Sequence, residues 1–151
     1  MGAIEKAIYY LNIKPRTREQ VVKYLEKKDF DGDEIEKAVR ELEEYRYIDD
    51  LNYCRMYFDV CFEKGKGIAR IKRELAEKGV DRQTIDEALD EMEEVPDQFE
   101  MALKAGERIL QEAGEFEPDE RQKIKARIAR RLAGKGFTSD IVYSVIRELM
   151  D

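Results

Sequence analysis

The chain has 151 residues, of which 42% are hydrophobic and 42% are charged, and its formal net charge is −7 at pH 7. This balance excludes an intrinsically disordered chain, which would be less apolar, and a membrane-embedded chain, which would carry fewer charges. Uncharged runs fall far short of the roughly 20 apolar residues that span a bilayer, and the N-terminus has no signal-peptide pattern. We therefore expect a soluble, cytoplasmic, helical protein.

The composition also argues against catalysis. The chain contains no histidine, no glycine-rich phosphate loop, and no serine or cysteine with an evident activating partner. Cys54 and Cys61 lie seven residues apart on one expected helix, which puts their Cα atoms about 10 Å apart and beyond disulfide reach. We expect both thiols to be buried and reduced, and we expect no enzyme activity, catalytic residue, metal or cofactor.

Three helices are predicted in the first third of the chain. The first is indicated by apolar residues spaced three and four apart, which are Ile4, Ala7, Ile8 and Leu11. Val21 and Leu25 mark the apolar face of the second. Asp31 is a preferred N-cap residue. It precedes the third apolar face, made of Ile35, Ala38, Val39 and Leu42.

The second third repeats this pattern fifty residues later. Either Asp49 or Asp50 can accept a hydrogen bond from the free amides at the start of the next helix. Asp50 is expected to cap the helix that begins at Leu51. Gly65 and Gly67 end that helix. The next helix carries Ile71 and Leu75 and stops at Gly79, and Asp81 caps the third. The first-helix residues Ile4, Ala7, Ile8 and Leu11 align with Cys54, Tyr57, Phe58 and Cys61.

The last third repeats the pattern after a further shift of fifty-seven residues. Ile128 and Leu132 mark its middle helix, Gly136 the turn, and Thr138 the cap of its last helix. Its first helix is placed at 99–110 without a fixed register. The stretch 111–120 contains Gly114, Pro118 and four glutamates, and is expected to form a longer acidic loop.

The predicted fold is therefore all-α, with three-helix repeats at 1–50, 51–97 and 98–151. A repeat of about fifty residues buries little surface alone, so the repeats should stack into an elongated, curved array. Tyr9, Tyr24 and Tyr57 are expected in the core. Tyr45 and Tyr47 are expected to wedge between the first two repeats.

A family resemblance is carried by the block Tyr47-Ile48-Asp49-Asp50, by Cys54 and Tyr57, and by the runs 65–67, 70–71, 74–75 and 78–80. These residues resemble the central signature of the RecX family, and the resemblance extends over essentially the whole chain. It implies a bacterial regulator that binds the recombinase RecA and restrains its nucleoprotein filament. Within the signature, Asp49, Asp50, Gly67, Leu75 and Gly79 are expected to have structural roles. Cys54 departs from the family pattern, which has alanine there.

Charge is unevenly distributed along the sequence. Seven cations and no acid lie in 121–136, whereas 86–100 carries eight acids and no cation. The repeat register places several cations on one outer face, which is predicted to bind the RecA and DNA filament: Lys66, Arg70, Arg73, Lys123, Arg127, Arg130 and Arg131. A simple solvated face is the alternative interpretation. A sequence pI near 5.0 argues against extensive DNA contact.

Three functions stay open at this point. The resemblance favours a regulator, acting as a monomer, that inhibits the recombinase, ATPase and coprotease activities of RecA and so acts in DNA repair, recombination and the SOS response. The cationic face also suits a stand-alone module that binds single- or double-stranded DNA. A helical protein-interaction scaffold, for which the cations would be dispensable, is the third.

Overall fold

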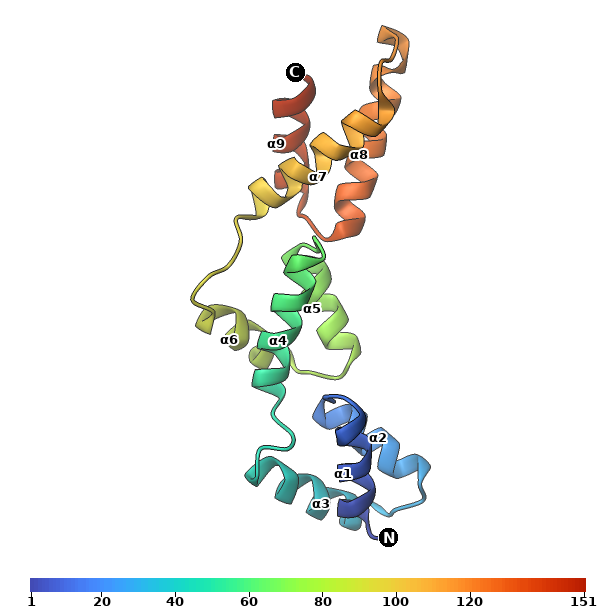
Figure 1. Cartoon of the computed structure of the whole chain (residues 1–151), viewed down its shortest axis with the longest axis vertical. Coiled ribbons are helices and arrows are strands. Elements are labelled where there is room, and N and C mark those ends of the chain that lie inside the picture. Colours follow the sequence, from blue (N-terminus) through green and yellow to red (C-terminus); the bar gives the residue numbers. More distant parts are fainter. The chain divides into compact units, whose positions relative to one another are not determined.

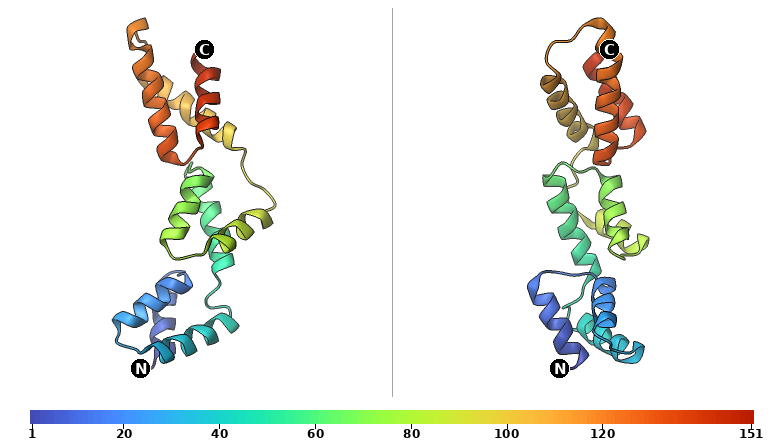
Figure 2. Two further views of the ribbon diagram at one scale, coloured as in Figure 1. Left: turned by 180° about the vertical axis from the view of Figure 1, so that it is seen from behind. Right: turned by 90° about the vertical axis from the view of Figure 1, so that its right-hand side faces the viewer.

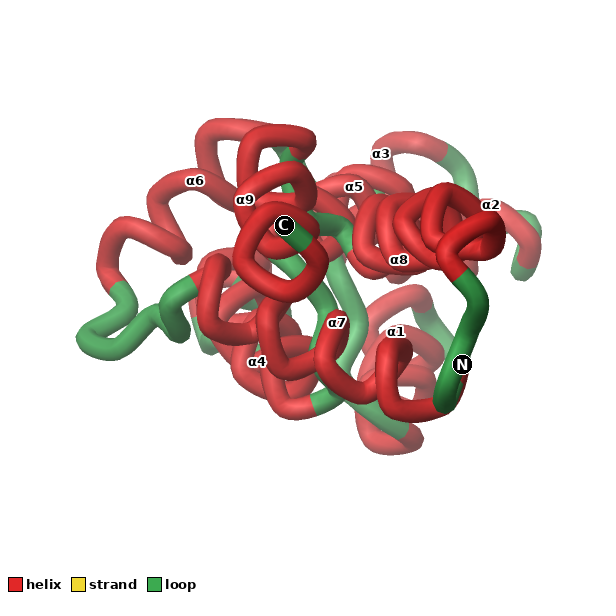
Figure 3. The backbone as a smooth tube through the Cα atoms, turned by 90° about the horizontal axis from the view of Figure 1, so that it is seen from above, coloured by secondary structure: helices red, strands yellow, loops and turns green.

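The structure is a computed structural model that describes residues 1–151, and it confirms the all-α prediction. Figure 3 shows helices and loops and no strand. The elements are α1 (Ala3–Ile13), α2 (Arg18–Lys27), α3 (Gly32–Glu44), α4 (Asp50–Glu63), α5 (Ile68–Glu77), α6 (Arg82–Glu91), α7 (Gln98–Ala113), the 3₁₀ turn η1 (Pro118–Glu120), α8 (Arg121–Lys135) and α9 (Ser139–Met150).

The helices form two compact units. Unit 1 comprises Met1–Tyr57 and Glu74–Met92, and unit 2 comprises Phe58–Arg73 and Glu93–Asp151. Helices α4 and α5 contribute residues to both units. Each unit thus holds one complete three-helix repeat together with parts of the middle repeat.

In unit 1, helices α1, α2 and α3 pack against one another in pairs (Figure 1). Each contributes one apolar face, and Ile48 is added from the segment that follows α3. The resulting core consists of Ala3, Ala7, Val21, Leu25, Ile35, Ala38, Val39, Leu42 and Ile48.

In unit 2, α7 packs against both α8 and α9, which also contact each other (Figure 2). The core consists of Ala102, Ile109, Ile124, Ile128, Leu132, Phe137, Val142, Val145 and Met150. The expected acidic loop at 111–120 is shorter than predicted, because α7 continues to Ala113 and Pro118–Glu120 form a 3₁₀ turn.

The predicted repeat register holds at the middle helices. Val21, Ile71 and Ile128 are each fully buried. The next aligned set, Leu25, Leu75 and Leu132, is also fully buried. Apolar side chains with a spacing of four therefore occupy the same structural position three times, as one helix face requires.

The turn after each middle helix also recurs. Asp29, Gly79 and Gly136 have φ angles of 68°, 90° and 102°, so all three aligned residues adopt the left-handed conformation that ends a helix. The aligned caps follow. Asp31 accepts from Glu34 N at 2.9 Å and Asp81 accepts from Thr84 N at 2.8 Å. Thr138 occupies the cap position of α9, but its side chain accepts no backbone hydrogen bond there.

The predicted register of the first helices is wrong. Ala7, Cys54 and Ala102 are each the fifth residue of their helix, and each is fully buried. Cys54 therefore corresponds to Ala7, not to Ile4. The shift of fifty residues, which aligns the middle helices, does not align the first helices, because α4 has 14 residues and α1 has only 11. Burial raises the pKa of the Cys54 thiol to about 12, so this side chain stays protonated at neutral pH and acts as a small apolar group.

The tyrosines correct a second expectation. Tyr9 is 62% exposed and is not part of the core. Tyr45 and Tyr47 are 70% and 55% exposed and do not wedge between repeats, because the neighbouring Ile48 fills the core position. Tyr24 is partly buried and stacks on the Tyr10 ring, with 4.0 Å between ring centroids. The Tyr57 hydroxyl donates to the Glu74 carboxylate at 2.7 Å.

Unit 1 contains a junction between the first two repeats, where the start of α2 meets residues of the second repeat. The buried Thr17 hydroxyl donates to the Lys78 carbonyl at 2.7 Å. The amide of Arg18, the first residue of α2, donates to the Asp50 carboxylate at 2.8 Å. The prediction that Asp50 caps its own helix is therefore wrong. Asp49 has that role and accepts from Asn52 N at 3.1 Å.

Unit 2 contains an equivalent junction at the start of α5. Gly67 N donates to the Lys135 carbonyl at 2.7 Å, and Ala69 N donates to the Gly136 carbonyl at 3.2 Å. The amide of Ile68, the first residue of α5, donates to the Gln98 side chain at 3.0 Å. Gln98 and Asp50 are both the first residue of the next repeat's first helix. Each following repeat therefore supplies a cap to the middle helix before it.

Asp50 gives a prediction about pH. Removal from water raises the pKa of its carboxyl group, so folding disfavours the charged form. Its contribution to stability is greatest below the unfolded-state pKa of about 3.9 and declines as pH rises through the raised folded-state value. Asp50→Asn keeps an acceptor and cannot ionise. As pH rises from 4 to 7, its free energy of unfolding should therefore increase relative to that of the wild type. Urea unfolding followed by circular dichroism measures this difference.

Asp50→Ala is the matched control. It removes the acceptor for Arg18 N at every pH and should cost about 1 kcal/mol. If the Asn variant lost as much stability at pH 7 as the Ala variant, the carboxylate charge itself would be needed at this helix start.

Candidate interaction surface

Helix α8 carries an exposed row of cations. Lys123, Arg127 and Arg130 are spaced four and three residues apart, so they lie on one helix face, and all three are exposed. None of them forms an ion pair within 4.0 Å. We call these three residues the cationic α8 face. Its charges are not neutralised by neighbours, so their field extends into solvent.

Three other cations of α8, Arg121, Lys125 and Arg131, form ion pairs with acids. Arg121 and Lys125 both approach the Asp151 carboxylate, at 3.9 Å and 2.8 Å. Arg131 pairs with Glu112 of α7 at 3.1 Å and is therefore turned toward that helix. The cations of the acid-free run 121–136 thus differ from one another in the structure. Some are paired with acids that lie far away in the sequence, and the cations of the α8 face are not.

The predicted cations of the middle repeat have different surroundings. Arg73 is exposed and has no ion pair. Lys66 is partly buried. Arg70 is also partly buried, and one of its guanidinium nitrogens donates to the Gly134 carbonyl at 3.3 Å. Arg70 therefore binds the C-terminal end of α8 at the unit 2 junction, where carbonyl groups favour a cation.

In the first repeat, the aligned cations have local partners. The Arg16 guanidinium lies 3.9 Å from the centroid of the Tyr10 ring, and Lys23 pairs with Glu19 at 3.9 Å. Among the cations at these aligned positions, Lys123, Arg127 and Arg130 of α8 and Arg73 of α5 are thus exposed without an ion pair.

No group of three or more His, Cys, Asp or Glu side chains is placed to hold a metal ion. Both cysteines are free thiols and both are buried. No helix combines the length and apolar sequence that crossing a lipid bilayer requires.

The recurring helix positions, turns and junction caps define a protein of tandem three-helix repeats. Models of the first, second and third three-helix domains of RecX match residues 3–42, 49–89 and 96–146. The chain belongs to the RecX family.

Relatives and solved structures agree with this assignment. The chain is 31% identical to the regulatory protein RecX of Bacillus licheniformis over 145 residues, which cover 95% of this chain and 54% of the relative. It is 31% identical to the regulatory protein RecX of Clostridium botulinum over 147 residues, which cover 97% and 68%. The crystal structure of RecX from Lactobacillus salivarius has a TM-score of 0.81 and 27% identity, covering 97% of this chain and 94% of that one. The chain spans about half the length of the first curated relatives that it matches.

Proposed function

We propose that this chain is a regulator that binds RecA and its nucleoprotein filament and inhibits the recombinase, ATPase and coprotease activities of RecA, without catalysis of its own. Membership of a family whose relatives are named regulatory proteins supports the regulatory role. The cationic α8 face carries the proposal for the contact. Three exposed and unpaired cations have no evident task within the chain, and they suit the phosphates of a DNA-bound filament.

The DNA-dependent ATPase of RecA tests this function. Adding the chain to RecA on single-stranded DNA should reduce the rate of ATP hydrolysis as its concentration rises. The inhibition should weaken with added salt, because exposed charges are screened over about 8 Å at physiological ionic strength and counterion release opposes phosphate binding. An unchanged ATPase rate at low salt would refute the proposal.

The free cations also favour a second candidate, a stand-alone nucleic-acid-binding module. A pull-down with RecA in the absence of DNA separates the two. The regulator should retain RecA without DNA, whereas the stand-alone module should bind a DNA oligonucleotide and leave RecA in solution.

A further inference from the structure

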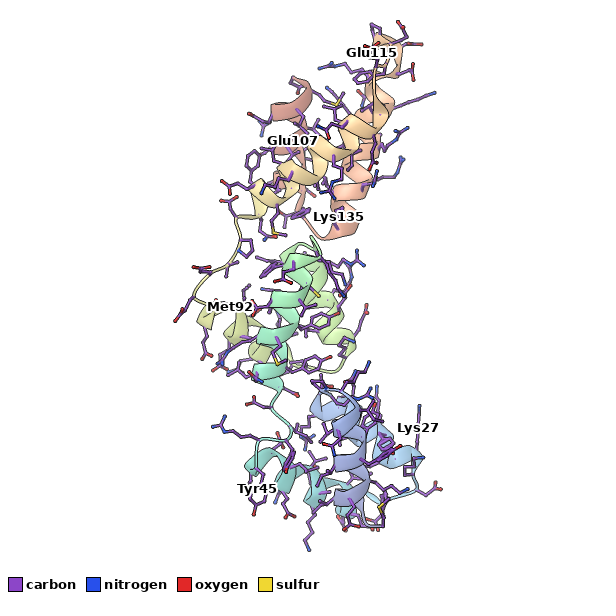
Figure 4. The ribbon with its side chains drawn as sticks, viewed as in Figure 1. Lys27, Tyr45, Met92, Glu107, Glu115 and Lys135 are labelled. Atoms are coloured by element: carbon purple, nitrogen blue, oxygen red, sulfur yellow. The ribbon has the colours of Figure 1, made fainter.

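The turn after α3 exposes two large aromatic side chains next to each other. Tyr45 and Tyr47 are 70% and 55% exposed, and Arg46 lies between them with 83% of its side chain exposed. Figure 4 shows Tyr45 at the C-terminal end of α3, directed away from the ribbon. We call residues 45–47 the tyrosine turn. Tyrosine and arginine are enriched among the residues that contribute most of the binding free energy in protein–protein interfaces. Their joint exposure here points to an interaction surface.

The backbone of the tyrosine turn is fixed. Tyr47 N and Ile48 N both donate to the Leu42 carbonyl, at 2.9 Å and 3.2 Å, and Ile48 is buried beneath the turn. Arg46 adopts a φ of 59°, a left-handed conformation that costs a non-glycine residue about 1 kcal/mol. Its guanidinium lies 3.5 Å from the Asp49 carboxylate. A partner therefore meets two aromatic rings on an ordered backbone, so little entropy is lost on binding.

An acidic groove extends from the tyrosine turn along the outer face of α3. It is an open groove of about 380 Å³ between side chains of this one helix, and it ends at Tyr45. Four carboxylates and two cations line it, namely Asp33, Glu36, Glu41, Glu44, Lys37 and Arg40. Arg40 already pairs with Glu36 at 3.6 Å. Asp33, Glu41 and Glu44 form no ion pair. The free charge in the groove is therefore predominantly negative, and it repels phosphates while attracting ammonium and guanidinium groups.

We propose that the tyrosine turn and the α3 groove together bind a lysine- and arginine-rich segment of a protein partner. The two tyrosine rings pack against the aliphatic stems of the segment and attract its cations through their π faces, and the free carboxylates bind the charged ends. This assignment rests on the proposed function for the identity of the partner, RecA. The chain then has two surfaces of opposite charge, one for protein and one for phosphates.

The test compares Tyr45→Ala/Tyr47→Ala with Tyr143→Ala, a control that removes another exposed tyrosine, on α9. The first measurement is the affinity for RecA without DNA, by fluorescence anisotropy. We expect the double variant to bind at least tenfold more weakly and the Tyr143 variant to bind like the wild type. Circular dichroism should show unchanged melting, since exposed positions contribute little to stability. Unchanged RecA affinity in the double variant would overturn the inference and leave the proposed function intact.

A second probe decides the case in which the wild type fails to bind RecA, which would refute the proposed function. The probe is a fluorescein-labelled peptide of nine arginines, with a nine-nucleotide thymidine oligonucleotide as the anionic comparison. The wild type should bind the peptide at least tenfold more tightly than the double variant does, and both should bind the oligonucleotide equally. Equal peptide affinities would overturn the inference independently of RecA.

Discussion

Gly67→Ala is expected to destabilise the protein by about 3 kcal/mol or more. A Cβ atom at position 67 would lie 2.5 Å from the carbonyl oxygen and 2.6 Å from the carbonyl carbon of Gly136. These are backbone atoms at the end of α8, so they cannot move aside as a flexible side chain can. The start of α5 and the end of α8 must separate, which weakens the hydrogen bonds from Gly67 N to Lys135 O and from Ala69 N to Gly136 O. Overpacking and the lost bonds together give this magnitude.

Urea unfolding monitored by circular dichroism measures the effect, and Gly134→Ala is the control. Gly134 lies in α8, two residues before Gly136, and a Cβ atom there meets nothing within 4 Å. The control should be more stable than the wild type by about 0.5 to 1 kcal/mol, because alanine is the better helix former. A Gly67→Ala protein as stable as the wild type would mean that α5 and α8 do not meet in solution.

Reversing two charges on the cationic α8 face is expected to have the largest effect on activity. Arg127→Glu/Arg130→Glu replaces two exposed, unpaired cations with acids, so it should raise the concentration for half-inhibition of the RecA ATPase by at least tenfold. Folding should be almost unaffected, because the native side chains make no ion pair that the reversal could break. Inhibition is measured in the ATPase assay over a range of salt concentrations, and folding by thermal melting.

Arg121→Glu/Lys125→Glu is the matched control, since it makes the same change in net charge on the same helix. These two cations are neutralised by Asp151 and do not belong to the cationic α8 face. The control should inhibit RecA nearly as well as the wild type, although losing its ion pairs costs some stability. Equal loss of inhibition in both variants would show that overall charge, rather than this face, determines binding.

The sequence was a good guide wherever local rules determine the structure. The buried set Leu25, Leu75 and Leu132 follows from helix periodicity, and the left-handed turns at Gly79 and Gly136 follow from the position of each glycine at a helix end. These features depend on residues only a few positions apart, so a single sequence is enough to predict them.

The sequence was a poor guide wherever the partner lies far along the chain. The neighbouring carboxylates Asp49 and Asp50 are both suitable caps, and only the fold shows that Asp50 bonds to Arg18, 32 residues earlier. Gln98 was missed for the same reason, although its place directly after the cap Asp97 matches that of Asp50 after Asp49. Likewise, Arg130 and Arg131 are equivalent in the sequence, and only the approach of Glu112 from α7 distinguishes them.

The repeat junctions also determine when the first repeat can finish folding during synthesis. The Thr17 hydroxyl can form its native hydrogen bond only after Lys78, which is 61 residues later in the chain, has been synthesised. At a synthesis rate of about 5 to 20 residues per second, that delay is roughly 3 to 12 s. During this time the hydroxyl that the folded protein buries lacks its native acceptor and bonds to water, and the first amide of α2 similarly lacks Asp50 until that residue has been made. A nascent chain that stalls on the ribosome within the second repeat would therefore present an incomplete first repeat to chaperones and proteases.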